Sequence, residues 1–256
     1  MLKKIYKQII KNIFSLYDKK KINAIVLFGS RARGDSNKDS DYDINVFTNG
    51  NEKGINWGYD SIGDNIFISF IDERQFKDYR RKAHSFLYCT FRDGLVLYQN
   101  NSWFNEQRKR VLKLKPSKEI TFFYLKNCLT NLGWCSINKK KDFLNIYIED
   151  GKVIANQLGF AILMNNEIYP ISPHTLREEL INLNKKRYEK IANAISYVQD
   201  AYYKNKIPNE LFYLNKLEYI KSFGKDYMKK NFPQSFIEFT KSEEIVQKIE
   251  DNITIK

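Results

Sequence analysis

Apolar residues recur every three or four positions at the start of the chain, and short apolar runs follow. Over residues 2–19 lysines occupy the positions between the apolar ones, which predicts an amphipathic helix. Residues 22–29 (INAIVLFG) are apolar and rich in β-branched side chains, which is typical of a buried strand. Residues 41–48 (DYDINVFT) alternate in polarity, and residues 66–71 (IFISFI) and 95–99 (LVLYQ) are short apolar runs. We therefore predict strands at all of these runs.

Polar, turn-forming segments connect these runs. Residues 31–40 (RARGDSNKDS) predict a loop, and the Gly- and Asn-rich residues 49–65 predict another. Asp72 is placed to cap a helix that we expect to extend to Ala83. Gly94 predicts a turn before the last of the short strands.

The pattern changes near Pro116, after which the apolar positions are spaced for helices up to about residue 231. We expect later helices to start at Ser172 or Thr175, and to cover 186–205 and 209–230. The expected fold class is therefore α+β. A mixed α/β domain over residues 1–115 is followed by an all-helical bundle over residues 116–256.

The composition is that of an ordinary globular protein with an excess of positive charge. Of the 256 residues, 43% are hydrophobic and 29% are charged, and 43 Lys and Arg against 30 Asp and Glu give a net charge of +13. Such an excess favours anionic partners: nucleotides, nucleic acid or an acidic protein. The alternative interpretation is that the many lysines form an ordinary solvated surface.

Several classes of protein are excluded at this stage. No apolar run approaches the roughly 20 residues that cross a bilayer, and lysines interrupt the first residues, so we expect neither a membrane protein nor a secretory signal. The cysteines are scattered, at Cys89, Cys128 and Cys135, and form no C-x-x-C pair. We therefore expect no disulfide framework, no thiolate zinc site and a reducing, cytoplasmic setting.

Two short motifs on neighbouring predicted strands carry the candidate chemistry. Gly29 and Ser30 end one strand, and Asp41 and Asp43 begin the next, with ten residues (31–40) between them. Because side chains alternate along a strand, the two carboxylates lie on one face and repel one another unless a cation lies between them. Such a hard oxygen site suits Mg²⁺ or Mn²⁺. Gly29 lets the backbone approach a phosphate, to which Ser30 can donate hydrogen bonds.

Arg31 and Arg33 lie in the segment between these motifs, where forked guanidinium groups could bind a triphosphate. Each motif alone can be explained without any function. A Gly-Ser pair is usually a turn, and Asp35, Asp39, Asp41 and Asp43 could form a solvated acidic loop. The combination of both motifs around a buried strand favours the functional interpretation.

The segment LFGSRARGDSNKDSDYDINVF (27–47) resembles the nucleotidyltransferase superfamily that includes DNA polymerase β, through the pattern h-G-[GS]…D-h-[DE]-h. It is similar to the minimal and the aminoglycoside nucleotidyltransferases, and the resemblance extends more weakly to about residue 100. It implies a mixed-sheet domain that binds a nucleoside triphosphate with Mg²⁺ and transfers the nucleoside monophosphate to a hydroxyl, releasing pyrophosphate. It also implies that Gly29 and Ser30 hold the β- and γ-phosphates, and that Asp41 and Asp43 hold the metal ions.

The family usually has a third carboxylate on a later strand, and here the matching place in IFISFI is held by Ser69. Serine is a poor magnesium ligand and no base. Asp64 and Asp72 flank this strand and are alternatives. Kanamycin-type relatives draw a carboxylate from their helical domain, which makes Glu149 and Asp150 candidates, and we choose Glu149 as the third catalytic acid.

Three functions stay open on the sequence alone. The first is an Mg²⁺-dependent nucleotidyltransferase whose acceptor is an RNA end, another nucleic acid or a protein. The second is an aminoglycoside-type antibiotic nucleotidyltransferase, with a small-molecule acceptor. The third is a catalytically weak, nucleotide-binding partner protein of the antitoxin type, which Ser69 keeps open. The Arg-x(4–6)-His motif of HEPN ribonucleases, whose bundles the helical half resembles weakly, does not occur.

Overall fold

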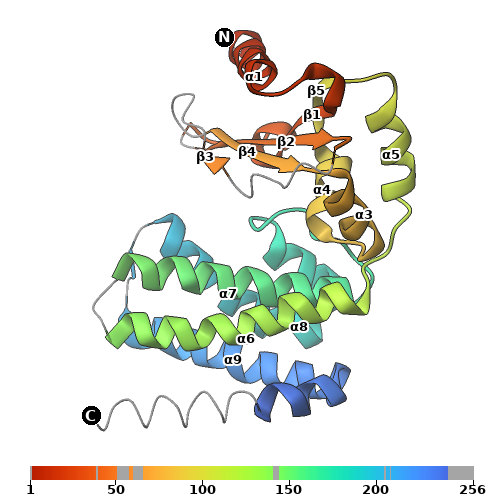
Figure 1. Ribbon diagram of the computed structural model, residues 1–256. Coiled ribbons are helices and arrows are strands. Elements are labelled where there is room, and N and C mark those ends of the chain that lie inside the picture. The colour runs from red at the N-terminus through yellow and green to blue at the C-terminus, as the bar shows by residue number, and fades with distance from the viewer. Residues whose placement is uncertain are drawn as a thin grey trace, which may run out of the picture. The chain divides into compact units, whose positions relative to one another are not determined.

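The computed structural model divides the chain into two compact units, residues 1–117 and 118–256 (Figure 1). Each is described by itself. The structure describes residues 2–38, 40–50, 58–59, 66–140, 144–204, 206–207 and 209–241.

A five-stranded mixed sheet forms the centre of the first unit, in the order β3-β4-β2-β1-β5. β2 pairs in parallel with β4 and antiparallel with β1, whereas β1–β5 and β3–β4 are antiparallel. The strand bounds are β1 Ile22–Phe28, β2 Tyr42–Thr48, β3 Gly58–Tyr59, β4 Ile66–Ile71 and β5 Leu95–Gln99. The four strands predicted from the apolar runs are therefore confirmed.

Helices cover both faces of this sheet, because both faces of its central strands are apolar. On one face, Ile9 and Ile13 of α1 (Leu2–Leu16) pack with the buried Leu27, Ile44 and Ile68. On the other face, one cluster unites α3 (Glu73–Arg81), α4 (Ser85–Asp93) and α5 (Trp103–Val111) with Phe47 and Ile71. β2 thus lies between two apolar layers, and the alternation of its side chains decides which of them each residue meets.

Local sequence signals explain several helix boundaries in the first unit. Asp72 caps α3, as predicted: its Oδ1 accepts a hydrogen bond from the backbone N–H of Gln75 at 2.7 Å, and the Gln75 side chain accepts one from the N–H of Asp72 at 3.2 Å. This reciprocal pair is a capping box. The loop predicted over residues 31–40 is partly wrong, because α2 (Gly29–Arg33) is a short helix that ends at Gly34, whose φ is +85°.

The second unit is a helical bundle, as the fold class predicted, of α6 (Lys118–Lys140), α7 (Leu144–Asn165), α8 (Leu176–Tyr203) and α9 (Glu210–Asn231). Its core is apolar and includes the fully buried Leu158, Ile195 and Ile220. α8 begins after Thr175 and is broken at Asn184, whose φ is −167° and ψ 97°. The Asn184 side chain accepts a hydrogen bond from the N–H of Arg187 at 3.0 Å and so starts a new helical segment. In the part of the chain that the structure describes, no helix is long and apolar enough to cross a membrane.

Candidate functional site

Gly29 and Asp43 lie against one another at one end of β1 and β2. Phe28, the last residue of β1, is in register with Asp43. Gly29 has a φ of +74°, and a Cβ atom placed on it would lie only 2.3 Å from Oδ2 of Asp43. The position therefore requires glycine for two reasons, the left-handed backbone and the carboxylate beside it. The two motifs found in the sequence meet in the fold.

Asp41 and Asp43 form a pair of interacting carboxylates. Burial raises the pKa of Asp43 to about 7, and the negative charge of Asp41 adds to this increase, whereas the positive charge of Arg33 acts against it. The pair therefore resists carrying two negative charges in the absence of a cation. Among the described residues there is no group of three or more His, Cys, Asp or Glu side chains that could hold a metal ion. Within the part of the chain that the structure describes, the candidate metal site is therefore the pair of Asp41 and Asp43.

The donor set fits a divalent cation of the magnesium type. Carboxylate oxygens are the protein ligands that Mg²⁺ prefers, and two of them often suffice because water and phosphate oxygens complete its coordination. The raised pKa of Asp43 reflects first its burial and then the negative charge of Asp41, and a bound cation would offset both. The residues that would hold the ion are Asp41 and Asp43.

Arg33 lies beside the acid pair and is shared among three acids. Its Nε is 3.1 Å from Oδ2 of Asp35, its Nη1 is 3.9 Å from Oδ2 of Asp93, and its charge acts on Asp43. The side chain keeps 18% exposure. Arg33 thus supplies positive charge at the place where the sequence predicted contact with a triphosphate.

Arg31 has a different set of contacts from those predicted. Its guanidinium donates from Nε to the carbonyl oxygens of Ser40 (2.9 Å) and Asp41 (3.1 Å), and a further bond runs from Nη2 to Ser40. Its Cζ lies 4.0 Å from the centre of the Tyr42 ring. Arg31 therefore fixes the backbone that carries Asp41, and its contact with a phosphate stays a prediction.

The first turn of α2 follows the Gly-Ser motif. Gly29 and Ser30 are its first residues, and Phe28 at the N-cap provides no side-chain hydrogen bond to the exposed backbone N–H groups. Ser30 is partly exposed, and its carbonyl accepts hydrogen bonds from the N–H groups of Gly34 and Asp35 at 2.9 and 3.1 Å. The motif thus continues into a helical turn rather than into the expected loop.

The register of β4 corrects the place given to the third carboxylate. Phe67, and not Ser69, is the partner of Asp43 across the parallel pair, whereas Ser69 is opposite Asn45. No acid of β4 therefore lies beside Asp43. Asp72 follows the far end of β4 and caps α3. Asp64 lies outside the described residues.

Glu149 belongs to the second unit. It lies on α7 next to the buried Ile148, and its own side chain is exposed. An exposed carboxylate at the surface of a helix is compatible with the predicted role, which stays a prediction.

Two contacts near the acid pair have no counterpart in the sequence analysis. The fully buried Asn45, on the same face of β2 as Asp43, donates from Nδ2 to Oγ1 of Thr90 at 2.8 Å. This bond attaches the strand of the acid pair to α4. Asp93, at the end of α4, forms two hydrogen bonds with Arg92 at 2.7 and 2.8 Å and lies near Arg33. The sequence did carry a signal for the contact between Asn45 and Thr90, because Asn45 is a polar residue within the apolar run INVF (44–47).

Two solved structures resemble most of the chain at low sequence identity. A nucleotidyltransferase-like protein from Exiguobacterium sibiricum 255-15 is 11% identical, with a TM-score of 0.41, over 88% of this chain and 77% of that chain. A spectinomycin adenyltransferase from Enterococcus faecialis, solved with ATP and spectinomycin, is 14% identical, with a TM-score of 0.49, over 86% of this chain and 99% of that chain. Both likenesses are too distant to bear on function.

Comparison with families of known sequence is more informative. No curated protein matches the chain significantly. Residues 8–102 match the family described as polymerase beta, nucleotidyltransferase, and this match includes the second part of α1, all five strands of the sheet and the acid pair. The chain therefore contains, in its first unit, a nucleotidyltransferase domain of the polymerase β superfamily.

Proposed function

We propose that the protein is a divalent-cation-dependent nucleotidyltransferase, which transfers a nucleoside monophosphate from a nucleoside triphosphate to an acceptor hydroxyl and releases pyrophosphate. The observation that carries the proposal is the meeting of Gly29 with the acid pair, in which Asp43 has a pKa raised to about 7. Neither a left-handed glycine beside a carboxylate nor a partly buried pair of like charges favours folding. Both are typical of a site that is completed by its ligands.

In this proposal each residue has a distinct task. Gly29 and Ser30 bind the β- and γ-phosphates, and Arg33 contributes positive charge beside them. Asp41 and Asp43 bind the cation, and Arg31 keeps the Asp41 backbone in place through its hydrogen bonds to Ser40 and Asp41. When bound, Mg²⁺ or Mn²⁺ neutralises charge on the triphosphate and on the departing pyrophosphate.

The transfer itself is an in-line substitution at the α-phosphorus. The acceptor oxygen forms the new P–O bond, and the bond between the α-phosphorus and the bridging oxygen to the β-phosphate breaks. We assign removal of the hydroxyl proton to Glu149 of α7, as the sequence predicted, and assign shaping of the acceptor site to the helical domain. The Glu149→Gln variant tests this: turnover falls while triphosphate affinity stays close to the original, and an unchanged rate removes Glu149 from the mechanism.

The principal experiment follows label and pyrophosphate together. The protein is incubated with each α-labelled triphosphate, Mg²⁺ or Mn²⁺, and panels of RNA, protein lysate and small molecules that include spectinomycin. We expect label on one class of acceptor and an equal amount of pyrophosphate. The Asp41→Asn/Asp43→Asn double variant should remain folded and lose transfer. Retained transfer in that variant contradicts the proposal.

A second candidate is a nucleotide-binding protein with little or no catalysis. The position of Phe67 favours it, because an aromatic ring occupies the β4 position beside Asp43. Triphosphate binding that depends on Asp41 and Asp43, without pyrophosphate release on any acceptor, identifies this function. Binding with turnover identifies the transferase.

A further inference from the structure

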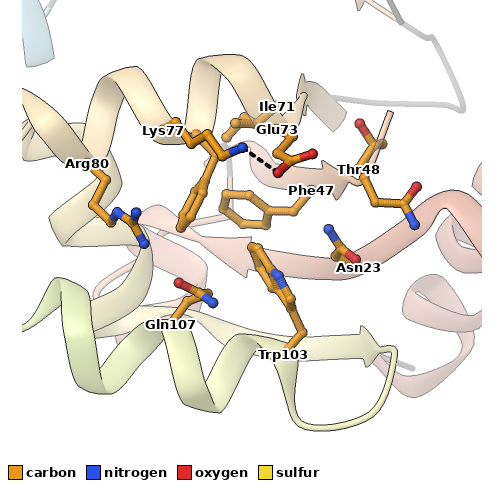
Figure 2. Close-up of a pocket in the computed structure, with 11 residues that line it drawn as sticks. Asn23, Phe47, Thr48, Ile71, Glu73, Lys77, Arg80, Trp103 and Gln107 are labelled. Atoms are coloured by element: carbon orange, nitrogen blue, oxygen red, sulfur yellow. Dashed lines mark ion pairs between the residues drawn. The ribbon is translucent and has the colours of Figure 1, made fainter. Parts of the chain in front are cut away.

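A cavity of about 280 Å³ lies in the first unit, at the end of β2 opposite Asp43 (Figure 2). It is formed where β1 begins and where β2 and β4 end, with α3 and α5 on its other sides. Asp43 and Thr48 are five residues apart on the strand, which separates them by about 16 Å. The cavity is therefore distinct from the acid pair. Its volume is slightly below the roughly 300–1,000 Å³ of sites for drug-sized ligands, which suits a small ligand.

Aromatic rings form the inner wall of this cavity. Trp103 lies 5.3 Å from Phe47 and 5.3 Å from Phe76, measured between ring centres, and Phe47 and Phe76 are 6.0 Å apart. Phe47 and Phe76 are buried, whereas Trp103 is partly exposed. Trp103 is therefore the ring of this wall that a flat aromatic ligand can contact, and Phe47 and Phe76 hold it in place.

One cation of the lining is left without an acid. This cation is Arg80 of α3. Asp78, two positions before it in the sequence, pairs with Arg81 at 2.9 Å and with Lys82 at 2.8 Å, and Glu73 pairs with Lys77 at 2.6 Å. Among the described residues, Arg80 forms no ion pair, and its Cζ lies 5.7 Å from the centre of the Phe76 ring. A guanidinium group over an aromatic wall is suited to an anionic group on an aromatic ligand.

One buried acceptor of the lining also has no partner. Oε1 of Gln107, on α5, is buried and accepts no hydrogen bond from the residues that the structure describes. Figure 2 shows the Gln107 amide, the Arg80 guanidinium and the Trp103 indole directed toward the same part of the cavity. Buried polar atoms are normally satisfied, so this oxygen indicates a missing donor.

We propose that this cavity is a second ligand site, for a small molecule with a flat aromatic ring that carries an N–H donor and one anionic group. The ring stacks against the exposed part of Trp103, its N–H donates to Oε1 of Gln107, and its anion binds Arg80. Phosphate and carboxylate both satisfy the chemistry of Arg80, so the ligand is either a nucleotide or an aromatic acid. The site neither requires nor alters the assignment of the acid pair.

Calorimetric titration of the full chain in EDTA, without triphosphate, tests the site with two probes. AMP carries a phosphate and indole-3-acetate a carboxylate, and adenosine and indole are their neutral counterparts. We expect at least one anion to bind more tightly than its counterpart. Arg80→Gln should weaken it by roughly tenfold or more, because a charge-assisted contact is lost. Arg81→Gln is the matched control on the same helix, since Arg81 is exposed and paired with Asp78, and it should bind as the original protein does.

Two further variants make the result unambiguous. Gln107→Leu should bind more weakly without a lower melting temperature, because it removes an unpaired buried atom rather than a bond. The Asp41→Asn/Asp43→Asn variant should keep the affinity, which shows that the probe is not at the acid pair. The proposal is overturned if neither anion binds more tightly than its counterpart, if Arg80→Gln and Arg81→Gln bind alike, if Gln107→Leu binds as well as the original, or if the acid-pair variant loses binding.

Discussion

The Cα atom of Gly29 packs directly against the carboxylate of Asp43, so that a single added methyl group would lie 2.3 Å from Oδ2. Residues that are fourteen positions apart in sequence are thus held in contact by the antiparallel pairing of β1 and β2. A side chain at residue 29 would displace the Asp43 carboxylate, so the two halves of the proposed triphosphate site depend on one another.

Alanine substitutions at two glycines separate backbone strain from this contact. Gly29 and Gly34 have φ values of +74° and +85°, but a Cβ on Gly34 meets nothing within 4 Å. Gly34→Ala should therefore cost only the left-handed backbone strain, roughly 1–2 kcal/mol of unfolding free energy. Gly29→Ala should cost more and abolish Mg²⁺-triphosphate binding, measured by denaturation and by titration. Equal effects of the two substitutions would show that the contact with Asp43 is unimportant.

Asp43→Asn should stabilise the metal-free protein while it abolishes nucleotide transfer. Because the folded-state pKa of Asp43 is about 7, above the ordinary value of 3.8, the folded state binds this proton more tightly than the unfolded state does. The stability that the proton provides is lost as the pH rises from about 4 to about 7, by at most about 4 kcal/mol. Unfolding in EDTA at pH 8 should therefore require more denaturant for Asp43→Asn than for the original chain.

Asp78→Asn is the control for this effect, because the pKa of Asp78 is shifted in the opposite direction from that of Asp43. Hydrogen bonds from Lys82 and Arg81 lower the pKa of Asp78, so ionisation of this exposed carboxylate favours the folded state. Its substitution should give no gain in stability at pH 8. A gain of similar size in both variants would indicate a general effect of net charge rather than the conflict within the acid pair.

Protonation of His84 should contribute a loss of stability to the first unit in mild acid. Its Nδ1 accepts a hydrogen bond from the N–H of Phe86 at 3.2 Å at the start of α4, and burial, with the charge of Lys82, lowers its pKa from 6.5 to about 4. The unfolded state thus binds this proton more tightly, so stability is complete above about pH 6.5 and is lost as the pH falls to 4, by at most about 3 kcal/mol.

His84→Asn should remove this dependence, because asparagine can cap the helix without titrating. Between about pH 4 and 7, His84 makes the free energy of unfolding rise with pH, whereas Asp43 makes it fall. In the original chain these two effects largely cancel. The stability of His84→Asn, measured by denaturation from pH 4 to 7, should fall steadily as the pH rises. A profile that coincides with that of the original chain would contradict the low pKa.

The bond between Asn45 and Thr90 should contribute to stability as a pair. Thr90→Val leaves the buried Asn45 amide without its acceptor and should cost about 1–3 kcal/mol of unfolding free energy. The Asn45→Leu/Thr90→Val double variant removes both polar groups and should cost less than the sum of the two single changes. A double-mutant cycle measures this coupling, and strict additivity would show that the bond contributes nothing.

The sequence predicted the parts of the fold that local patterns encode. The apolar runs located β1, β2, β4 and β5, and Asp72 marked the start of α3. The five-residue helix α2 was missed because it is too short to show a helical period, and α4 and α5 were not predicted because their aromatic residues follow no clear stripe. The break of α8 at Asn184 explains why the pattern there predicted a helix from residue 186.

The candidate site was predictable only within single strands. Alternation alone placed Asp41 and Asp43 on one face, but the register between strands depends on tertiary pairing, which no local pattern determines. The pattern of the resembled family put Ser69 in the place of the third carboxylate, whereas the strand register puts Phe67 opposite Asp43. The turn of Arg31 onto the carbonyl groups of Ser40 and Asp41 likewise depends on how the intervening segment folds back.

The pairing of β1 with both β2 and β5 has a consequence for how the protein acquires its structure. Leu27 is paired with Leu95 as well as with Ile44. The pairing of β1 with β5 therefore joins residues that are far apart in sequence, and it can form only when the chain between them has folded back. Contacts between consecutive helices such as α6 and α7 need no such closure. Long-range strand pairing slows folding relative to local helix packing. The helical unit should therefore mature first during refolding, and cation binding at the acid pair should appear only with the slower phase.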